Sequence, residues 1–253
     1  MKLPQPLYAM YERKLVASLS ADRLPQHIGV MVDGNRRWAA LMGETTRHGH
    51  LKGAERITEF LGWCRELGIP MVTLYMLSTE NLKRSAEELS DLIGIIDDLL
   101  VQLAESGEAR LQPVGALELL PEQLSTRVHE VAADTATVEG LHVNIAVGYG
   151  GRQEIVDAVR ELLLDADREG QSLQQVAREL SVEGISGCLY TRGQPDPDLV
   201  IRTSGEQRLS GFMMWQSAYS EFYFCEALWP DFRRVDFLRA LRDYASRQRR
   251  FGC

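Results

Sequence analysis

An acid, a turn and two arginines follow one another at residues 33–38, and these residue types suit chemistry on a phosphate group. The run 27–32 before them is short and apolar, which is typical of a buried strand, and Asp33 stands where that strand would end. Gly34 and Asn35 then lead into an expected helix start that carries Arg36, Arg37 and Trp38. A carboxylate beside free backbone N–H groups suits a phosphate together with a divalent metal. Asp-Gly is also a common turn, so a plain strand–turn connection is the alternative.

Polar, Gly-rich or cationic segments also follow three later apolar runs. They are Ser78-Thr79-Glu80-Asn81 after 71–77, residues 148–152 after 141–147, and residues 202–206 after 197–201. Ligands of open parallel sheets gather at the carboxyl ends of the strands. One such loop would be an ordinary connection, but four at the same edge indicate a polar ligand.

Arginines lie in these loops or at the helix starts beside them. They are Arg37, Arg84, Arg202 and Arg208. Arginine stays charged and can bind two phosphate oxygens at once, although a surface ion pair is the alternative for any single one. Magnesium takes only one or two carboxylates besides substrate oxygens. With Asp33 and Glu221, the arginines therefore suggest a site for one or more diphosphates and Mg²⁺.

Apolar side chains surround this edge. Those from the strands and one helix are Met71, Leu74, Met76, Leu77, Ile93, Ile95, Ile96, Leu99, Leu100 and Val143. For most of them ordinary core packing is the expected role. A phosphate-binding edge joined to an apolar tunnel would still suit an amphiphilic substrate such as a prenyl diphosphate.

The elements that must position these side chains alternate along the chain. Strands are predicted at 27–32, 71–77, 109–114, 141–147, 197–201 and 221–224. Helices are predicted at 34–42, 51–67, 86–106, 121–135, 151–168, 172–180, 212–219 and 233–248. This alternation predicts an α/β fold, a single domain with a central, mostly parallel six-stranded sheet flanked by helices. We expect residues 1–23 to form an N-terminal helical segment and 24–253 the catalytic domain.

The bulk properties narrow the class of protein. The net charge of −8 argues against a nucleic-acid binder. The four cysteines are scattered without zinc spacing, which suits a reducing compartment. Neither a signal peptide nor an apolar run long enough to cross a bilayer is present, so a cytoplasmic protein is expected. Peripheral contact with a membrane stays open.

From about residue 24 to 252 the sequence closely resembles the cis-prenyltransferases, the undecaprenyl diphosphate synthase family. The resemblance rests on separated blocks in one order: 33–39, Gly49-His50 with Gly53-Ala54, 78–81, 144–146 with 149–152, 198–206, and Trp229-Pro230-Asp231-Phe232. It implies that family's fold, with a hydrophobic tunnel, and condensation of isopentenyl diphosphate with an allylic diphosphate. The trans-prenyltransferases are excluded, because the Asp97-Asp98 pair is followed by Val101 rather than a third aspartate.

The resemblance also assigns roles. It makes Asp33 a magnesium ligand essential for catalysis and Glu221 the second metal-binding acid. The allylic diphosphate falls to Gly34, Asn35, Arg36, Arg37, His50 and Arg84, and isopentenyl diphosphate to Arg202, Arg208 and Ser210. Asn81 and Ser78 match residues near the reacting carbons, and Trp38 and Glu80 complete the substrate-binding set. The resemblance further implies a homodimer, in which Arg250-Phe251-Gly252 would reach the isopentenyl diphosphate site across the interface.

Several positions depart from the family pattern. Thr46 replaces a diphosphate-binding arginine of longer-chain members, and Arg47 is a candidate substitute. Leu82 and Gln207 replace a usual Trp and His. Met76 stands where long-chain members usually have Ala, and a bulky side chain there should block a growing chain.

Residues 77–82 and 193–198 also look like actinobacterial short-chain members that make (2Z,6E)-farnesyl diphosphate. We therefore expect geranyl diphosphate plus one isopentenyl diphosphate as the main reaction. A medium- or long-chain product is the alternative, because Met is flexible and Met76 could swing aside. A non-catalytic subunit and a family-derived terpene cyclase are further alternatives. The base that accepts the proton is not identifiable from the sequence.

Overall fold

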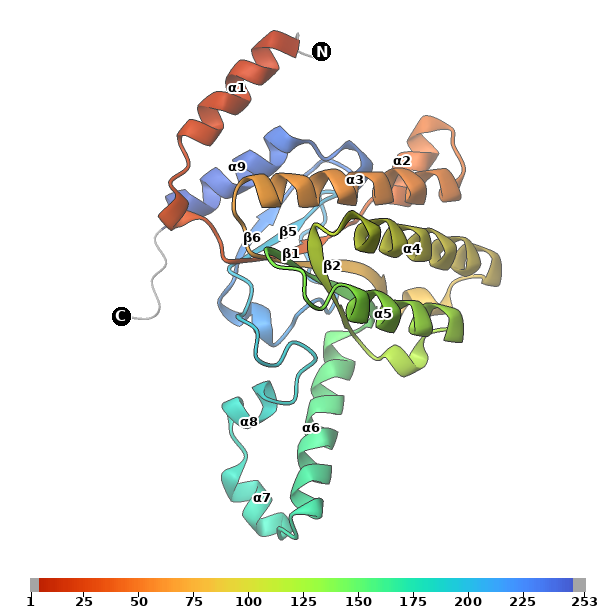
Figure 1. The fold of residues 1–253 in the computed structure, drawn as a ribbon, viewed down its shortest axis with the longest axis vertical. Helices are drawn as coiled ribbons and strands as arrows, with labels where there is room; N and C mark the ends of the chain where they lie inside the picture. The colour runs from red at the N-terminus through yellow and green to blue at the C-terminus, as the bar shows by residue number, and fades with distance from the viewer. Residues whose placement is uncertain (1–4, 248–253) are drawn as a thin grey trace.

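A six-stranded sheet forms the centre of the computed structural model, which describes residues 5–247 (Figure 1). The strands are β1 (His27–Met31), β2 (Met71–Ser78), β3 (Ala109–Val114), β4 (Leu141–Tyr149), β5 (Leu199–Arg202) and β6 (Glu221–Phe224). Every neighbouring pair is parallel, in the order β3-β4-β2-β1-β5-β6. β1 and β5 are buried along their whole length, as expected for short apolar strands in a covered parallel sheet. The predicted α/β fold is confirmed.

The order in which strands are added to the sheet reverses at β1, because β2 lies on one side of it and β5 on the other. Met31, the last residue of β1, pairs with Arg202, the last residue of β5. A reversal of this kind opens a crevice at the carboxyl edge of the sheet, where open α/β proteins bind ligands. Asp33 and Arg202 therefore meet in one crevice, although 169 positions separate them in the sequence.

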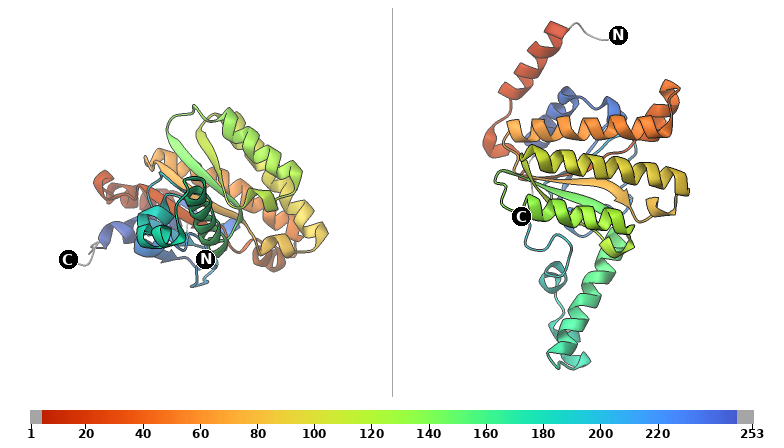
Figure 2. Two further views of the ribbon diagram at one scale, coloured as in Figure 1. Left: turned by 90° about the horizontal axis from the view of Figure 1, so that it is seen from below. Right: turned by 45° about the vertical axis from the view of Figure 1, so that its right-hand side comes forward.

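Three long helices lie side by side over one face of the sheet (Figures 1 and 2). They are α3 (Thr46–Glu66), α4 (Ala86–Ser106) and α5 (Glu122–Asp134). The short α2 (Asn35–Met42) packs on α3, and α1 (Gln5–Ala17) packs on α9 (Arg234–Ser246). The 3₁₀ turns are Ala21–Arg23, Asn81–Lys83, Leu117–Leu119, Gln216–Tyr219 and Trp229–Asp231.

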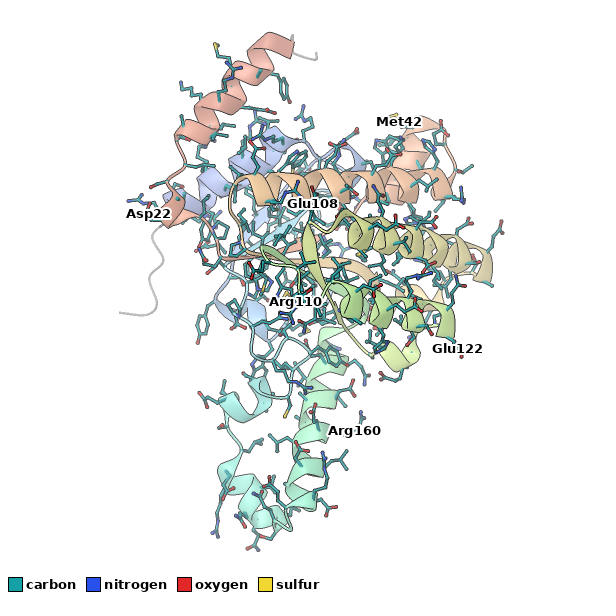
Figure 3. All side chains as sticks on the ribbon, in the orientation of Figure 1. Asp22, Met42, Glu108, Arg110, Glu122 and Arg160 are labelled. Atoms are coloured by element: carbon teal, nitrogen blue, oxygen red, sulfur yellow. The ribbon has the colours of Figure 1, made fainter. Side chains whose placement is uncertain are left out.

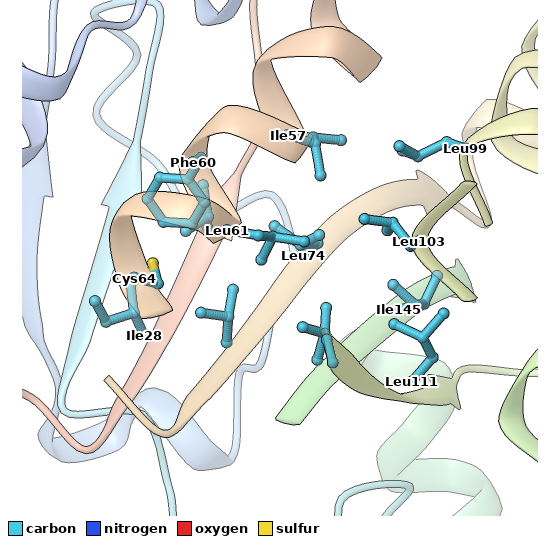
Figure 4. Close-up of a cluster of buried hydrophobic side chains, with 14 of the residues drawn as sticks. Ile28, Ile57, Phe60, Leu61, Cys64, Leu74, Leu99, Leu103, Leu111 and Ile145 are labelled. Atoms are coloured by element: carbon cyan, nitrogen blue, oxygen red, sulfur yellow. The ribbon is translucent and has the colours of Figure 1, made fainter. Parts of the chain in front are cut away.

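The main hydrophobic core lies between this helical layer and the sheet. Figure 4 shows Ile57, Phe60 and Leu61 of α3 near Leu74 of β2, with Leu99 and Leu103 of α4 beside them. These side chains recur at helical spacing, so each helix turns one apolar stripe toward the sheet. The core therefore fixes the positions of α3 and α4, whose amino-terminal halves border the crevice.

The segment that connects β4 to β5 along the chain forms a helical arm that projects from the body of the molecule (Figures 1 and 2). It consists of α6 (Gly151–Arg168), α7 (Leu173–Glu179) and α8 (Val182–Ser186), and Figure 3 places Arg160 on it. Large apolar side chains on the arm are exposed: Val156, Leu163, Leu164, Leu173, Leu180 and Val182. Within one chain this surface has no cover.

The structure differs from the predicted elements in three places. Helix α3 begins at Thr46 rather than residue 51, because the Thr45 hydroxyl accepts a hydrogen bond from the His48 N–H and caps it. Residues 212–219 form only a 3₁₀ turn at Gln216–Tyr219, since Met213 has a positive φ of 44°. Helix α8 was not predicted. The amino-terminal helix expected within 1–23 is present as α1.

Candidate active site

A cavity of about 800 Å³ lies at the carboxyl edge of the sheet, at the crevice between β1 and β5. Most of the predicted site residues line it: Asp33, Gly34, Asn35, Arg36, Arg37, His50, Met76, Ser78, Glu80, Asn81, Arg84, Arg202 and Ser210. They come from the ends of three strands and from α2, α3 and the segment before α4. The grouping predicted from strand ends is therefore present in space.

The Asp33 carboxylate lies between two guanidinium groups. Its Oδ2 accepts a hydrogen bond from Nη2 of Arg202 at 2.8 Å, and its Oδ1 lies 3.6 Å from Nη2 of Arg37. Burial raises the pKa of the Asp33 carboxyl, but the hydrogen bond from Arg202, the nearby Ser204 hydroxyl and the charges of Arg202 and Arg37 lower it by more, so the pKa lies below its ordinary value. Asp33 is therefore ionised at neutral pH in a strongly cationic setting.

The backbone of Asp33 is fixed as tightly as its side chain. The Asp33 N–H donates to Oγ1 of Thr203 at 3.1 Å, and that hydroxyl donates to the Asp33 carbonyl oxygen at 2.7 Å. The Asp33 carbonyl also accepts from the Trp229 N–H at 3.0 Å. The short segment between β1 and α2 is thereby held against the end of β5.

Gly34 and Gly53 let α2 approach its neighbours closely. Gly34 has a φ of +114°, and a Cβ there would come within 2.9 Å of the Leu228 side chain. A Cβ on Gly53 of α3 would lie 2.5 Å from Oδ1 of Asn35. These glycines bring the amino end of α2, with its free N–H groups, to the cavity.

A second cationic group gathers around one carboxylate that the sequence did not single out. Oε1 of Glu88 lies 3.0 Å from Nη1 of Arg84, 3.4 Å from Nε of Arg36 and 3.9 Å from Nε2 of His50. Burial, with Arg84 nearby, lowers the pKa of His50 to about 4, so this imidazole is neutral at pH 7. Glu88 does not itself line the cavity. It lies against Arg84, Arg36 and His50, which do line the cavity.

Arg202 and Ser210 form the other wall. The Arg202 side chain is only 4% exposed, and its Nη1 donates to Oγ of Ser210 at 3.1 Å and to the Arg208 carbonyl oxygen. The Arg208 side chain pairs with Glu206 and does not line the cavity. Arg208 thus supplies a backbone acceptor here rather than its guanidinium.

Ser78 and Asn81 bind each other at the end of β2. The Ser78 N–H donates to Oδ1 of Asn81, and the Asn81 N–H donates to Oγ of Ser78, both at 3.1 Å. The predicted pair is therefore rigid and faces the cavity together with Glu80.

The structure does not bring Glu221 to Asp33 within one chain. Glu221 starts β6 opposite Leu199, whereas Arg202 at the other end of β5 lies opposite Phe224. Glu221 therefore sits toward the amino edge of the sheet, where its Oε2 accepts from Nη1 of Arg247 at 2.6 Å. The sequence could not show this, because a strand's residue types do not tell which end of it meets a site.

Two further assignments are placed differently. Trp38 does not line the cavity and stacks on His48 at 6.0 Å between ring centroids. Thr46 lines the cavity, whereas Arg47 pairs with Asp91 at 3.5 Å and does not. Arg47 thus does not occupy the place of the missing arginine. The element Arg250-Phe251-Gly252 lies outside the described residues.

An apolar extension leads from the cavity toward the core. It has a volume of only about 30 Å³ and shares Met76, Leu92, Asn35, His50 and Val32 with the main cavity. Beyond them it is lined by Ile57, Ile95, Ile96 and Leu99, among others. Met76 therefore lies between the polar cavity and a small apolar one.

These features define a class of protein. A parallel α/β sheet carries a cationic crevice for anionic head groups where its strand order reverses, and an apolar pocket adjoins the crevice. Such a site fits amphiphilic molecules with phosphate head groups. Among residues 5–247, no helix is long and apolar enough to span a membrane.

The chain belongs to the undecaprenyl diphosphate synthase family (Prenyltransf), whose family model matches residues 31–252. It is 55% identical to isoprenyl transferase 1 of Streptomyces avermitilis, over 97% of this chain and 96% of that protein. It is 56% identical to (2Z,6E)-farnesyl diphosphate synthase of Thermobifida fusca, over 98% of each. The structure of lavandulyl diphosphate synthase from Lavandula x intermedia, in complex with dimethylallyl diphosphate, superposes with a TM-score of 0.85 at 32% identity, covering 91% of this chain and 99% of that one.

Proposed function

We propose that this protein is a short-chain cis-prenyltransferase that joins isopentenyl diphosphate to geranyl diphosphate and releases (2Z,6E)-farnesyl diphosphate. The observation that carries this proposal is the position of Asp33. Its carboxylate lies between Arg37 and Arg202 at a cavity whose small apolar extension is lined by Met76. The 56% identity to the Thermobifida fusca enzyme supports the same reaction.

The donor set at Asp33 fits Mg²⁺. Within residues 5–247 no three His, Cys, Asp or Glu side chains are grouped so as to hold a metal ion by themselves. Magnesium commonly binds one or two carboxylates and completes its shell with substrate phosphate oxygens and water. Asp33 is ionised and one third exposed, so it would hold the ion together with a diphosphate. When bound, the ion would neutralise charge on that diphosphate.

The residues of the cavity divide the work between two head groups. Arg37, Arg36 and the amino end of α2 would bind the allylic diphosphate and stabilise the negative charge that develops as its C–O bond breaks. Arg202 and Ser210 would hold isopentenyl diphosphate with its double bond beside the allylic carbon, which supplies the proximity contribution. A carbon–carbon bond forms, and a proton leaves to give the new cis double bond. Ser78 and Asn81 would border the reacting carbons.

Met76 would limit the product to a short chain. An interior this closely packed has no room for a longer hydrocarbon unless a side chain is removed. The alternative is a medium- or long-chain product, which would require Met76, Ile96 and Leu99 to move apart.

A homodimer would supply what one chain lacks. The exposed apolar side chains of the α6–α8 arm would be covered, and a Glu221 carboxylate could approach the metal only from a second copy. Light scattering on the eluting protein should give twice the chain mass of 28.5 kDa. A monomer at micromolar concentration would exclude this arrangement.

One assay tests the reaction. Purified protein is incubated with Mg²⁺, labelled isopentenyl diphosphate and either geranyl or farnesyl diphosphate, and the dephosphorylated product is sized by chromatography. A fifteen-carbon alcohol from geranyl diphosphate is the expected result. Products of fifty or more carbons would refute the short-chain assignment, and no incorporation of label would refute the condensation itself.

A further inference from the structure

Ser204 adopts a backbone conformation that favours glycine. Its φ is +82°, and within residues 5–247 only Ser204, Ser210 and Met213 among the non-glycine residues have positive φ. The conformation is enforced from both sides. The Ser204 N–H donates to the Ala227 carbonyl at 2.7 Å, and its own carbonyl accepts from Nη1 of Arg37 at 3.4 Å. A residue with a Cβ is strained at such a position, whereas glycine is not.

The Ser204 side chain is buried and, among residues 5–247, unpartnered, which raises the question of why glycine does not occupy this strained position. The residue is 8% exposed, and its buried Oγ makes no direct hydrogen bond of ordinary geometry with the described residues. The neighbouring Thr203 hydroxyl already serves the Asp33 backbone. Arg37 joins Ser204 to Asp33, because its Nη1 donates to the Ser204 carbonyl at 3.4 Å and its Nη2 lies 3.6 Å from Oδ1 of Asp33. The Asp33 carboxylate is therefore the anionic group beside Ser204. A buried polar group without a partner is costly, so it calls for a role.

We propose that Ser204 is a positioning residue, whose hydroxyl donates to the Asp33 carboxylate and orients it when substrate head groups occupy the cavity. This inference rests on the proposed function, because it assigns Asp33 to the head-group and metal site. Ser204 does not line the cavity and so acts through Asp33 rather than on the substrate.

The charges around Asp33 explain why a neutral donor is useful there. Without ligand, both carboxylate oxygens face guanidinium groups, those of Arg202 and Arg37. An incoming diphosphate competes for the same guanidinium N–H groups. The Ser204 hydroxyl can remain hydrogen-bonded to the carboxylate during that exchange. Because it is neutral, it does not repel a metal cation, whereas another guanidinium in its place would. The strain at Ser204 is then the consequence of keeping a donor at a position where the backbone prefers glycine.

Two variants separate this role from a purely structural one. Ser204→Gly removes the hydroxyl and relieves the strain, whereas Ser204→Ala removes the hydroxyl and keeps the strain. We expect Ser204→Gly to melt at or above the wild-type temperature and Ser204→Ala at or below it. Both should lose roughly tenfold or more in kcat with geranyl and isopentenyl diphosphates, and both should need more Mg²⁺ for half-maximal rate. Activity and stability then change in opposite directions in the glycine variant.

A binding measurement makes the test independent of turnover. Calorimetry with inorganic pyrophosphate, with and without Mg²⁺, should show that both variants lose most of the Mg²⁺-dependent gain in affinity. If Ser204→Gly keeps kcat within about twofold of wild type and keeps that gain, the positioning role is refuted. If the wild type binds pyrophosphate with Mg²⁺ but forms no product, the proposed reaction fails while the role of Ser204 is still decided by the binding data.

Discussion

At the scale of single residues, the charge of Asp33 is the feature on which the site depends. Asp33→Asn keeps an oxygen that can accept from Arg202, so the fold should be retained. The loss of the negative charge should lower kcat by about 100-fold or more, because an amide is a poor magnesium ligand. Steady-state kinetics alongside thermal melting would check this. Loss of activity in proportion to loss of folded protein would instead give Asp33 only a structural role.

Glu88 is the residue whose importance appears only in three dimensions. It accepts a hydrogen bond from Nη1 of Arg84 and lies 3.4 Å from Nε of Arg36, and its negative charge offsets the repulsion between these two guanidinium groups. Glu88→Gln should therefore raise the KM for the allylic diphosphate by about 5–10-fold while changing the KM for isopentenyl diphosphate little.

Glu87→Gln is the matched control for Glu88. Glu87 lies in the same first turn of α4, is exposed and carries the same charge. The Glu87→Gln variant should leave the KM values for both diphosphates unchanged. Tighter binding of the allylic diphosphate by Glu88→Gln would mean that Glu88 competes with the substrate instead of holding its binding groups.

At the scale of elements, β2 sets the depth of the apolar extension through Met76. Met76→Ala removes about three heavy atoms between the main cavity and the extension lined by Ile57, Ile96 and Leu99. The product should lengthen by one or more five-carbon units, measured by chromatography of the dephosphorylated alcohols. An unchanged fifteen-carbon product would place the limit elsewhere, and Leu92→Ala would then be the next variant to size.

The strands were predictable because their cause is local. Short apolar runs such as 27–32 and 71–77 carry their own signal, and the residues after them fall at one edge by the geometry of parallel sheets. The turn at Gln216–Tyr219 was not, because the positive φ of Met213 arises from how the 203–213 segment packs.

The sequence predicted the site residues that directly follow a strand, because their position depends on a single loop. Asp33, Arg37 and Arg202 follow strands and were found from that fact. Glu88 and Ser204 were not, because each acquires its role from side chains on other elements. Glu221 was assigned from its residue type and from the family resemblance, and neither indicated which end of β6 it occupies within one chain.

At the scale of the whole molecule, two buried histidines make stability depend on pH. Nδ1 of His27 donates to the Pro195 carbonyl and Nε2 accepts from the Thr73 hydroxyl, both at 2.7 Å, and burial lowers the pKa of His27 to about 4. His50 has a pKa of about 4 for the same reason. In the unfolded chain both titrate near 6.5, so between pH 6.5 and 4 the unfolded state binds more protons.

The free energy of unfolding should therefore have its full value above pH 6.5 and decrease as the pH falls toward 4. The loss should be about 2–3 kcal/mol for each histidine at the lower limit. Urea unfolding at pH 7 and pH 5 would measure it, and His27→Gln should flatten the slope. A free energy that is level across this range would contradict the burial of neutral imidazoles.

The pairing of β5 with β1 also governs when the enzyme can first become competent during its synthesis. The acid is made early, with β1, but its buried guanidinium partner is translated 169 positions later. A nascent chain can already assemble β1, β2, β3 and β4 with their covering helices while the fifth strand is still inside the ribosome. Until residues 199–202 dock, that intermediate has an open strand edge at β1, and its Asp33 carboxylate has Arg37 but not Arg202 beside it. Roughly the last fifth of the chain therefore completes both the sheet and the cationic crevice.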